Sequence, residues 1–223
     1  MQSSFMAAGP STTLIEQDMT PGKGPDFKKL WADKVLKTNL VCSCMCWLHG
    51  SFNFYLITFY LKKFPGNIYI NSMCFAMADL LAYMSSGIVL KFFMVRQGLF
   101  FSYSVSLIAG LLYLANYNTQ STWLIPALVA LSRIGGSMSF NIGYVSVSRL
   151  FPTNYVTTVF GIVNFFSHMI TVGAPVVAEL EEPIPFVVFC FNSGSAILFS
   201  MQLLEVDKAK AIQLKKEEKE KKK

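Results

Sequence analysis

Six long stretches of mostly apolar residues, separated by short polar connectors, dominate the pattern of this chain. They cover residues 38–61, 68–90, 98–115, 122–148, 156–178 and 184–204. A helix needs roughly 20 such residues to cross the apolar core of a bilayer. The pattern therefore predicts an all-α membrane protein with six transmembrane helices over residues 38–204. Because the connectors are short, helices adjacent in sequence are expected to run antiparallel.

The segments outside the six stretches have other patterns. Residues 1–25 lack an apolar run and are expected to form a flexible N-terminal arm without a cleavable signal. Residues 26–37 repeat apolar positions at nearly helical spacing among lysines, which predicts an interfacial amphipathic helix with Trp31 at the lipid headgroups. A soluble linker helix is the alternative for 26–37. The charged, Lys-rich residues 205–223 predict a solvated helix or a disordered tail.

Composition narrows the class of protein. Hydrophobic residues make up 53% of the chain and charged residues 14%, whereas a soluble domain carries about 25% charged residues. This composition argues against a water-soluble enzyme, a disordered chain and a nucleic-acid-binding protein. The expected surroundings are the lipid bilayer, and nothing in the chain points to an enzyme.

The basic residues are distributed unequally between the two sets of connectors. One side, which includes both termini, receives 16 Lys and Arg residues, and the other receives only Lys62 and Lys63. Because Lys and Arg remain on the side from which helices insert, both termini are predicted on the cytosolic side, or on the matrix side of a mitochondrial membrane.

Four ionisable residues lie near the middle of predicted spans, where a charge costs roughly 2.5–3.5 kcal/mol to insert. They are His49, Asp79, Arg133 and His168. Asp79 and Arg133 are at similar depth, so we favour a buried structural ion pair over a direct role in substrate binding. For the histidines, hydrogen-bonded core residues are favoured over a proton relay, which stays possible because His titrates near neutrality.

The order of these residues suggests an internal repeat. Spans one, two, four and five each hold one ionisable group near the middle, whereas spans three and six hold none. A polar, polar, apolar triplet that occurs twice fits two three-helix inverted repeats, which is half of a major facilitator fold. Spans three and six are then expected to face lipid or to make drier contacts.

Small residues and a proline predict helix packing and a bend. Gly135, Ser139 and Gly143 recur every four residues, which favours close helix contact. Gly173 and Pro175 predict a kink in the fifth span. Cys42, Cys44 and Cys46 lack the spacing of zinc ligands, so no metal site and no cofactor is predicted.

Three stretches carry a family resemblance: residues 47–71, 73–86 and 132–175, the last of which includes Leu-Phe-Pro-Thr at 150–153. On these stretches, residues 27–204 resemble the C-terminal half of an organic cation/anion transporter of the major facilitator superfamily. The resemblance implies that Asp79 stands where the family often has Glu and that Arg133 stands at a commonly basic position. It also implies that His168 stands at a position tied to substrate charge.

The chain departs from this family at the charges of the cytosolic latch. Arg149 replaces an acidic residue, Val156 replaces an arginine, and residues 92–97 (FFMVRQ) replace Asp-Arg-x-Gly-Arg-Arg. The N-terminal six helices of the family have no counterpart here.

Three functional hypotheses follow. The favoured one is a membrane-embedded accessory or structural subunit of a larger complex, derived from half a transporter. The second is a working half-transporter for small organic ions, completed by a second copy or by a separate N-terminal half. The third is a fragment of a longer gene product. The first two require another membrane protein or a second copy to cover the polar face.

The charge distribution generates a topological prediction. Cysteines placed at Gly98 and Asn154 are expected to react with a membrane-impermeant reagent from the cytosolic or matrix side, and those at Gly66 and Asn118 from the opposite side. Reaction of all four positions from one side would contradict six spans.

Overall fold

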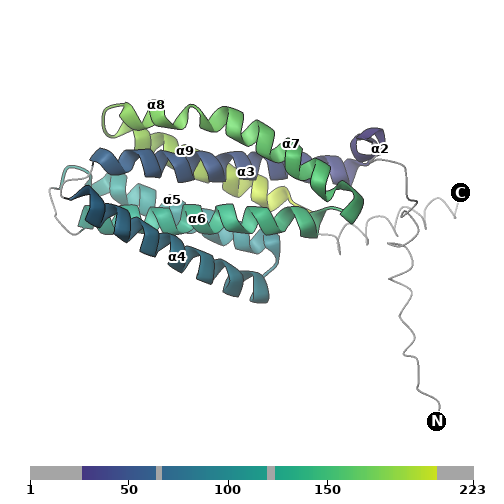
Figure 1. Ribbon diagram of the computed structural model, residues 1–223, viewed down its shortest axis with the longest axis horizontal. Helices are drawn as coiled ribbons and strands as arrows, with labels where there is room; N and C mark the ends of the chain where they lie inside the picture. Colours follow the sequence, from purple (N-terminus) through teal and green to yellow (C-terminus); the bar gives the residue numbers. More distant parts are fainter. Residues whose placement is uncertain (1–26, 64–66, 120–123, 205–223) are drawn as a thin grey trace, which may run out of the picture.

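The computed structural model describes residues 27–63, 67–119 and 124–204, and these residues form a helical bundle (Figure 1). The elements are α2 (Phe27–Ala32), α3 (Lys34–Tyr60), η1 (Leu61–Lys63), α4 (Ile68–Phe92), α5 (Val95–Asn116), α6 (Leu124–Leu150), α7 (Thr153–Thr171), α8 (Ala174–Glu179) and α9 (Ile184–Gln202). No strand occurs in the described part of the chain. The predicted arm 1–25 and tail 205–223 lie outside the described residues.

Each predicted apolar stretch corresponds to a long helix or to a consecutive pair of helices. Five of these units among the described residues are long and apolar enough to cross a membrane: α3 with η1, α4, α5, α7 with α8, and α9. The remaining unit, α6, has 27 residues and so is long enough to cross a membrane. Its many small and polar side chains leave it outside the set of five. A membrane span over residues 122–148 therefore stays a prediction.

The structure divides the amphipathic helix that was expected over residues 26–37. Asp33 ends α2 and caps α3, and its Oδ1 accepts hydrogen bonds from the backbone N–H of Val35 at 2.7 Å and of Leu36 at 3.4 Å. An Asp in this position satisfies N–H groups that a helix start leaves without partners. Residues 34–37 therefore belong to α3, and the separate helix α2 is only six residues long.

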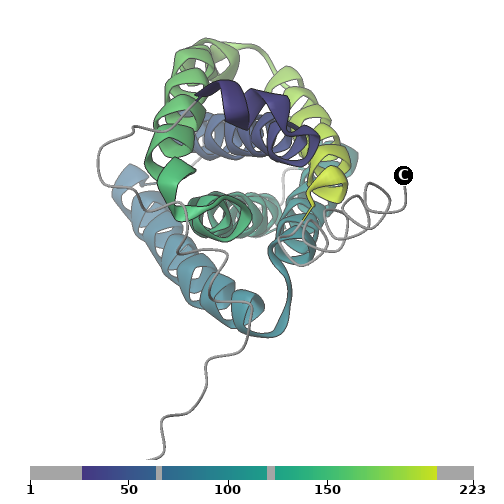
Figure 2. The ribbon, with the colours of Figure 1, turned by 90° about the vertical axis from the view of Figure 1, so that its right-hand side faces the viewer.

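Helices α3 and α6 make most of the contacts that hold the bundle together. α3 packs against α6, α7, α8 and α9, while α6 packs against α3, α4 and α5. α5 packs against both α6 and α9. More than half of the most apolar stretch of α5, and of that of α9, is nevertheless not buried in the bundle, so the orientation of these two helices toward lipid stays a prediction. Helices α4 and α7 with α8 are the most exposed of the five apolar units, and Figure 2 shows α4 at one edge of the bundle.

Glycines explain why α5 is so deeply packed. A Cβ atom on Gly135 would lie 2.7 Å from the backbone nitrogen of Ser106 and 2.9 Å from the backbone oxygen of Ser102, so α6 and α5 touch backbone to backbone. A Cβ atom on Gly110 would lie 2.7 Å from Cys190 Sγ and 3.0 Å from the Phe189 ring, so side chains of α9 pack directly against the backbone of α5. The Gly110 contact has no counterpart in the sequence analysis.

The predicted repeat of Gly135, Ser139 and Gly143 serves two neighbours of α6. Gly135 contacts α5, whereas a Cβ atom on Gly143 would lie 3.5 Å from the Trp47 ring of α3. Ser139 is buried between them. Successive steps of four residues rotate around a helix by roughly 40°, so the repeat turns gradually from one neighbour to the next.

The fifth span is interrupted at Val172 and Gly173, between α7 and α8. Pro175 is the second residue of α8 and has no N–H to continue the hydrogen-bond ladder of α7. The predicted position of the kink and the observed break therefore coincide.

The two ends of the described chain meet at one end of the bundle. The Asn39 side chain near the start of α3 donates to the Leu204 carbonyl at 2.7 Å and accepts from the Leu204 N–H at 2.8 Å. These two hydrogen bonds fasten the first turns of α3 to the residue that follows α9.

The close contact at Gly135 can be tested by comparing alanine substitutions at Gly135 and at the adjacent Gly136. Gly135→Ala is expected to lower the stability of the bundle by about 1–3 kcal/mol, because the methyl group collides with backbone atoms of α5. Gly136→Ala is the matched control, since a Cβ atom there would lie 3.9 Å from Ser106 Oγ. Thermal unfolding of the helical signal in detergent would measure both, and equal stability of the two variants would contradict the close approach.

Candidate functional site

A layer of polar side chains crosses the middle of the bundle and separates two apolar cores. One core extends from Leu40 to Trp47 along α3, and the other from Phe52 to Tyr60. Each of the six long units contributes polar residues between the cores: His49 and Ser51 of α3, Asp79 of α4, Ser106 of α5, Ser132, Arg133 and Ser137 of α6, Ser167 and Thr171 of α7, and Asn192, Ser193 and Ser195 of α9.

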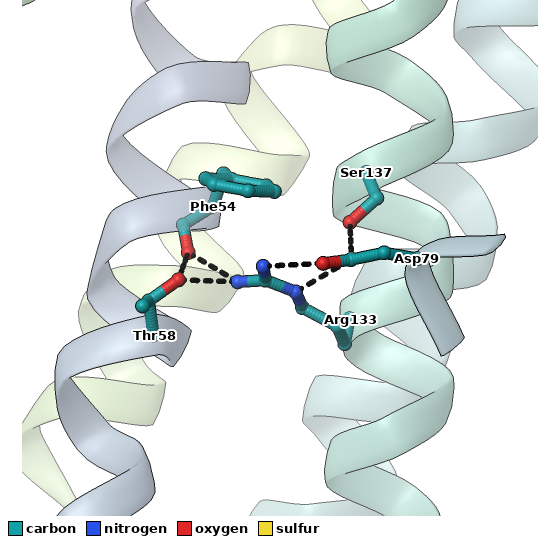
Figure 3. A network of polar contacts seen from close by, with 5 residues as sticks. All are labelled: Phe54, Thr58, Asp79, Arg133 and Ser137. Carbon is teal, nitrogen blue, oxygen red and sulfur yellow. Dashed lines mark hydrogen bonds and ion pairs between the residues drawn. The ribbon is translucent and has the colours of Figure 1, made fainter. Parts of the chain in front are cut away.

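The centre of this layer is the ion pair of Asp79 and Arg133, which joins α4 to α6 (Figure 3). Arg133 Nε donates to Asp79 Oδ1 at 2.8 Å, and Nη2 donates to Asp79 Oδ2 at 2.8 Å. Two parallel hydrogen bonds of this kind fix the orientation of both groups as well as their distance.

The second side of the guanidinium contacts α3. Arg133 Nη1 donates to the carbonyl oxygen of Phe54 at 2.8 Å and also to Thr58 Oγ1. The guanidinium carbon lies 3.8 Å from the centre of the Phe54 ring, within the range of a cation–π contact. Arg133 therefore ties three helices together, because its partners lie on α3 and α4.

Burial makes this network strong and also makes it costly to break. The Arg133 side chain is 5% exposed and that of Asp79 is 20% exposed. Ser137, one turn after Arg133 on α6, donates a further hydrogen bond to Asp79 Oδ1. Charges in so apolar a setting are tolerated when they are paired and hydrogen-bonded, and this geometry supports a structural role for the pair.

His49 is buried on the opposite side of α3 and contacts α9. Its Nε2 is 3.2 Å from Ser195 Oγ, and its ring stacks against Phe199 at 6.1 Å between centroids. One turn further along α3, Asn53 Nδ2 donates to Ser193 Oγ at 2.9 Å. The structure thus separates His49 from the ion pair and gives it a partner on the helix that was expected to be purely apolar.

His168 is exposed and joins neither His49 nor the ion pair. It follows Phe160 and Asn164 at intervals of four residues on one flank of α7. The Phe160 ring is 5.6 Å from the Tyr144 ring of α6, so this flank lies toward α6. Of the four ionisable residues, His168 is exposed, Asp79 is partly exposed, and His49 and Arg133 are buried.

An open hollow lies beside the network, between α4 and α6. It has a volume of about 370 Å³ and is lined by Tyr83, Phe140, Asn141 and Tyr144. The Phe140 ring stacks on Phe54 at 5.5 Å, and Phe54 in turn covers the guanidinium of Arg133. Aromatic rings with a few polar groups are typical of sites for small organic molecules.

Sequence reasoning found the charged residues of the layer and missed its uncharged ones. Thr58 and Ser137 complete the coordination of the ion pair, yet Ser and Thr are common in membrane helices and carry little signal alone. The available signal was spacing, since Ser137 follows Arg133 by one turn and Thr58 follows Phe54 by one turn.

The five cysteines are all free thiols, and three of them, Cys42, Cys46 and Cys190, are buried. No group of three or more His, Cys, Asp or Glu side chains that could hold a metal ion occurs within residues 27–63, 67–119 and 124–204.

Comparison with known proteins shows similarity to transporters. Organic anion transporter 3 of Rattus norvegicus and that of Mus musculus are each 25% identical to the chain over 206 residues, which cover 85% of the chain and 37% and 36% of the respective relatives. A Caenorhabditis elegans protein named only as a candidate transporter is 27% identical over 154 residues, 66% of the chain and 31% of that relative. No model of a known protein family matches the chain.

The chain therefore spans about a third of the length of these relatives. Together with its apolar helices, the similarity makes it a transporter-like, all-helical membrane protein. None of these relatives is named as an enzyme.

The ion pair generates a prediction for a double-mutant cycle. Asp79→Asn is expected to destabilise the bundle by about 3–5 kcal/mol, because it leaves the Arg133 guanidinium buried without a counter-charge. The double variant Asp79→Asn with Arg133→Gln is expected to recover much of this loss. Folded yield and thermal midpoint in detergent measure the effect, and additive losses would show that the two side chains do not interact.

Proposed function

We propose that this chain is a membrane-embedded accessory or structural subunit of a larger complex, built on half of a major facilitator fold. In this proposal α6 also crosses the membrane as the fourth of six spans, the two three-helix repeats are α3–α5 and α6–α9, and both termini face the cytosol or the matrix. The observation that carries the proposal is the open hollow between α4 and α6, whose lining includes the polar groups of Tyr83, Asn141 and Tyr144.

The hollow and His168 support a protein partner on that side. Tyr83, Asn141 and Tyr144 line the hollow, and His168 is exposed on the flank of α7 that lies toward α6. In a bilayer, polar groups at this depth would meet lipid tails, which offer no hydrogen bonds. Another membrane protein or a second copy of the chain would cover these groups and supply partners for them.

The ion pair supports a structural role over a role in transport. Arg133 donates four hydrogen bonds from its Nε, Nη1 and Nη2 atoms, to the Asp79 carboxylate, the Phe54 carbonyl oxygen and Thr58 Oγ1. A charge that binds a transported ion would have to exchange these partners for the substrate, and breaking a buried pair is costly. The charges of the layer thus act to hold α3, α4 and α6 in place.

The distribution of basic residues supports the orientation. Lys34, Lys37, Lys91 and Arg149 belong to the end of the bundle where α3 begins and α4 and α6 end. Lys62 and Lys63 lie at the other end, where Lys62 pairs with Glu179 and Lys63 donates to the carbonyl oxygen of Leu180. The second end thus carries few basic residues, as expected for the side opposite the positive one.

A half-transporter is the second candidate, and the hollow favours it. Its aromatic lining suits a small organic ion, and two similar proteins are named organic anion transporters. In this case a second bundle would close the hollow into a central site, as in two-halved transporters with sites near the midplane.

Measurement of mass tests the proposed subunit role. After extraction in mild detergent, the chain is expected to migrate with a partner or a second copy, well above the 24.9 kDa of one chain. A stable, folded species at the mass of one chain would contradict both candidates.

Uptake separates the two candidates. If the chain transports, Tyr144→Ala is expected to reduce accumulation of radiolabelled benzoate in vesicles about tenfold, because one wall of the hollow is removed. Tyr69→Ala is the matched control, since Tyr69 is 77% exposed near the start of α4 and does not line the hollow. Absence of benzoate uptake above protein-free vesicles, with the complex intact, would favour the structural role.

A further inference from the structure

The connector between α4 and α5 exposes three consecutive apolar side chains. Phe92 is 72% exposed, Phe93 54% and Met94 50%, and the connector lies at the end of the bundle where α3 begins. Water does not favour such a cluster, whereas the boundary between headgroups and acyl chains accommodates aromatic and aliphatic side chains. The exposure therefore indicates contact with the membrane interface.

Basic side chains flank this apolar cluster. Lys91 is exposed, and its Nζ lies 5.7 Å from the centre of the Phe92 ring. Arg149, at the end of α6, is also exposed, and its Nη1 donates to the carbonyl oxygen of Leu90 at 3.4 Å. This hydrogen bond holds a second cation next to Lys91, although the two residues are far apart in sequence.

The local charge is not matched by acidic residues of the same segment. No Asp or Glu occurs in the sequence between Asp79 and Glu179. Asp79 lies about four helical turns before the connector and pairs there with Arg133. At the opposite end, by contrast, Lys62 and Lys63 already have partners around Glu179 and Leu180. Two cations beside an exposed apolar cluster complement a group that is anionic and attached to hydrocarbon.

We propose that Lys91 and Arg149, together with Phe92, Phe93 and Met94, form a binding site for an anionic phospholipid. The two cations bind the headgroup phosphate, and the apolar side chains lie among the upper parts of the acyl chains. This inference rests on the proposed membrane-spanning fold, and it assigns a specific ligand class to the end of the bundle where α4 and α6 end.

Native mass spectrometry of the full chain in mild detergent tests the site. The probes are phosphatidylglycerol and phosphatidylcholine with identical acyl chains. The wild-type chain is expected to retain more phosphatidylglycerol than phosphatidylcholine. Because each basic residue near a membrane surface contributes roughly fivefold in affinity for anionic lipid, the variant Lys91→Gln with Arg149→Gln is expected to lose about tenfold or more of this preference.

Matched variants keep the test specific. Lys62→Gln with Lys63→Gln removes the same formal charge at the other end and is expected to leave the preference unchanged. Phe92→Ser with Phe93→Ser is expected to weaken the retention of both lipids, because it removes the apolar contact and keeps the cations. Equal effects of the two charge variants would overturn the proposed site in favour of a general response to net charge.

Two further outcomes separate this inference from its premises. Displacement of phosphatidylglycerol by inorganic phosphate at equal concentration would indicate a small-anion site and would overturn the lipid assignment. A chain that fails to enter liposomes would contradict the membrane-spanning fold itself. A chain that enters them and retains both lipids equally would contradict only the lipid site.

Discussion

The arrangement of the bundle depends on how one buried guanidinium obtains its partners. A charge in the middle of a membrane helix is tolerated only with hydrogen bonds and a counter-charge. Arg133 reaches Asp79 on α4 and the Phe54 carbonyl and Thr58 hydroxyl on α3. Hydrophobic burial alone allows many rotations of apolar helices against one another, since lipid tails are as apolar as the helix surfaces. The directional contacts of Arg133 select one relative placement of α3, α4 and α6.

Uncharged polar side chains of α3 make similar directional contacts with α7 and α9. Ser51 contacts both Ser167 and Thr171 of α7, with 3.0 Å between its Oγ and that of Thr171. Asn53 and His49 contact Ser193 and Ser195 of α9. α3 thus carries a polar group toward each of its long neighbours at about the same depth. Each contact is individually modest, but together they align the helices at a common level along the bundle.

The sequence predicted the helices well because their signal is local. Long apolar stretches specify helix positions, and Asp79 and Arg133 stand out as charges among apolar residues. Which helices touch was harder to predict, because it depends on surface shape. Spans three and six hold no ionisable group near their middle and so gave no sign of their neighbours, yet Gly110 and Gly135 allow α5 to pack tightly against both α9 and α6. The role of Asp33 as a cap was missed for a similar reason, since a single residue within an amphipathic pattern divides 26–37 into two helices.

The hydrogen bonds between Asn39 and Leu204 have a consequence for the order in which the bundle forms. They join residues 165 positions apart, and the main neighbours of α3, from α6 to α9, are all synthesised after it. The first long helix is therefore the most deeply buried of the apolar units and also the one that must wait longest for its contacts. During synthesis its polar side chains, Asn39, His49 and Asn53, face lipid or the insertion machinery. Completion of the bundle is then a late, long-range step that requires the final helix.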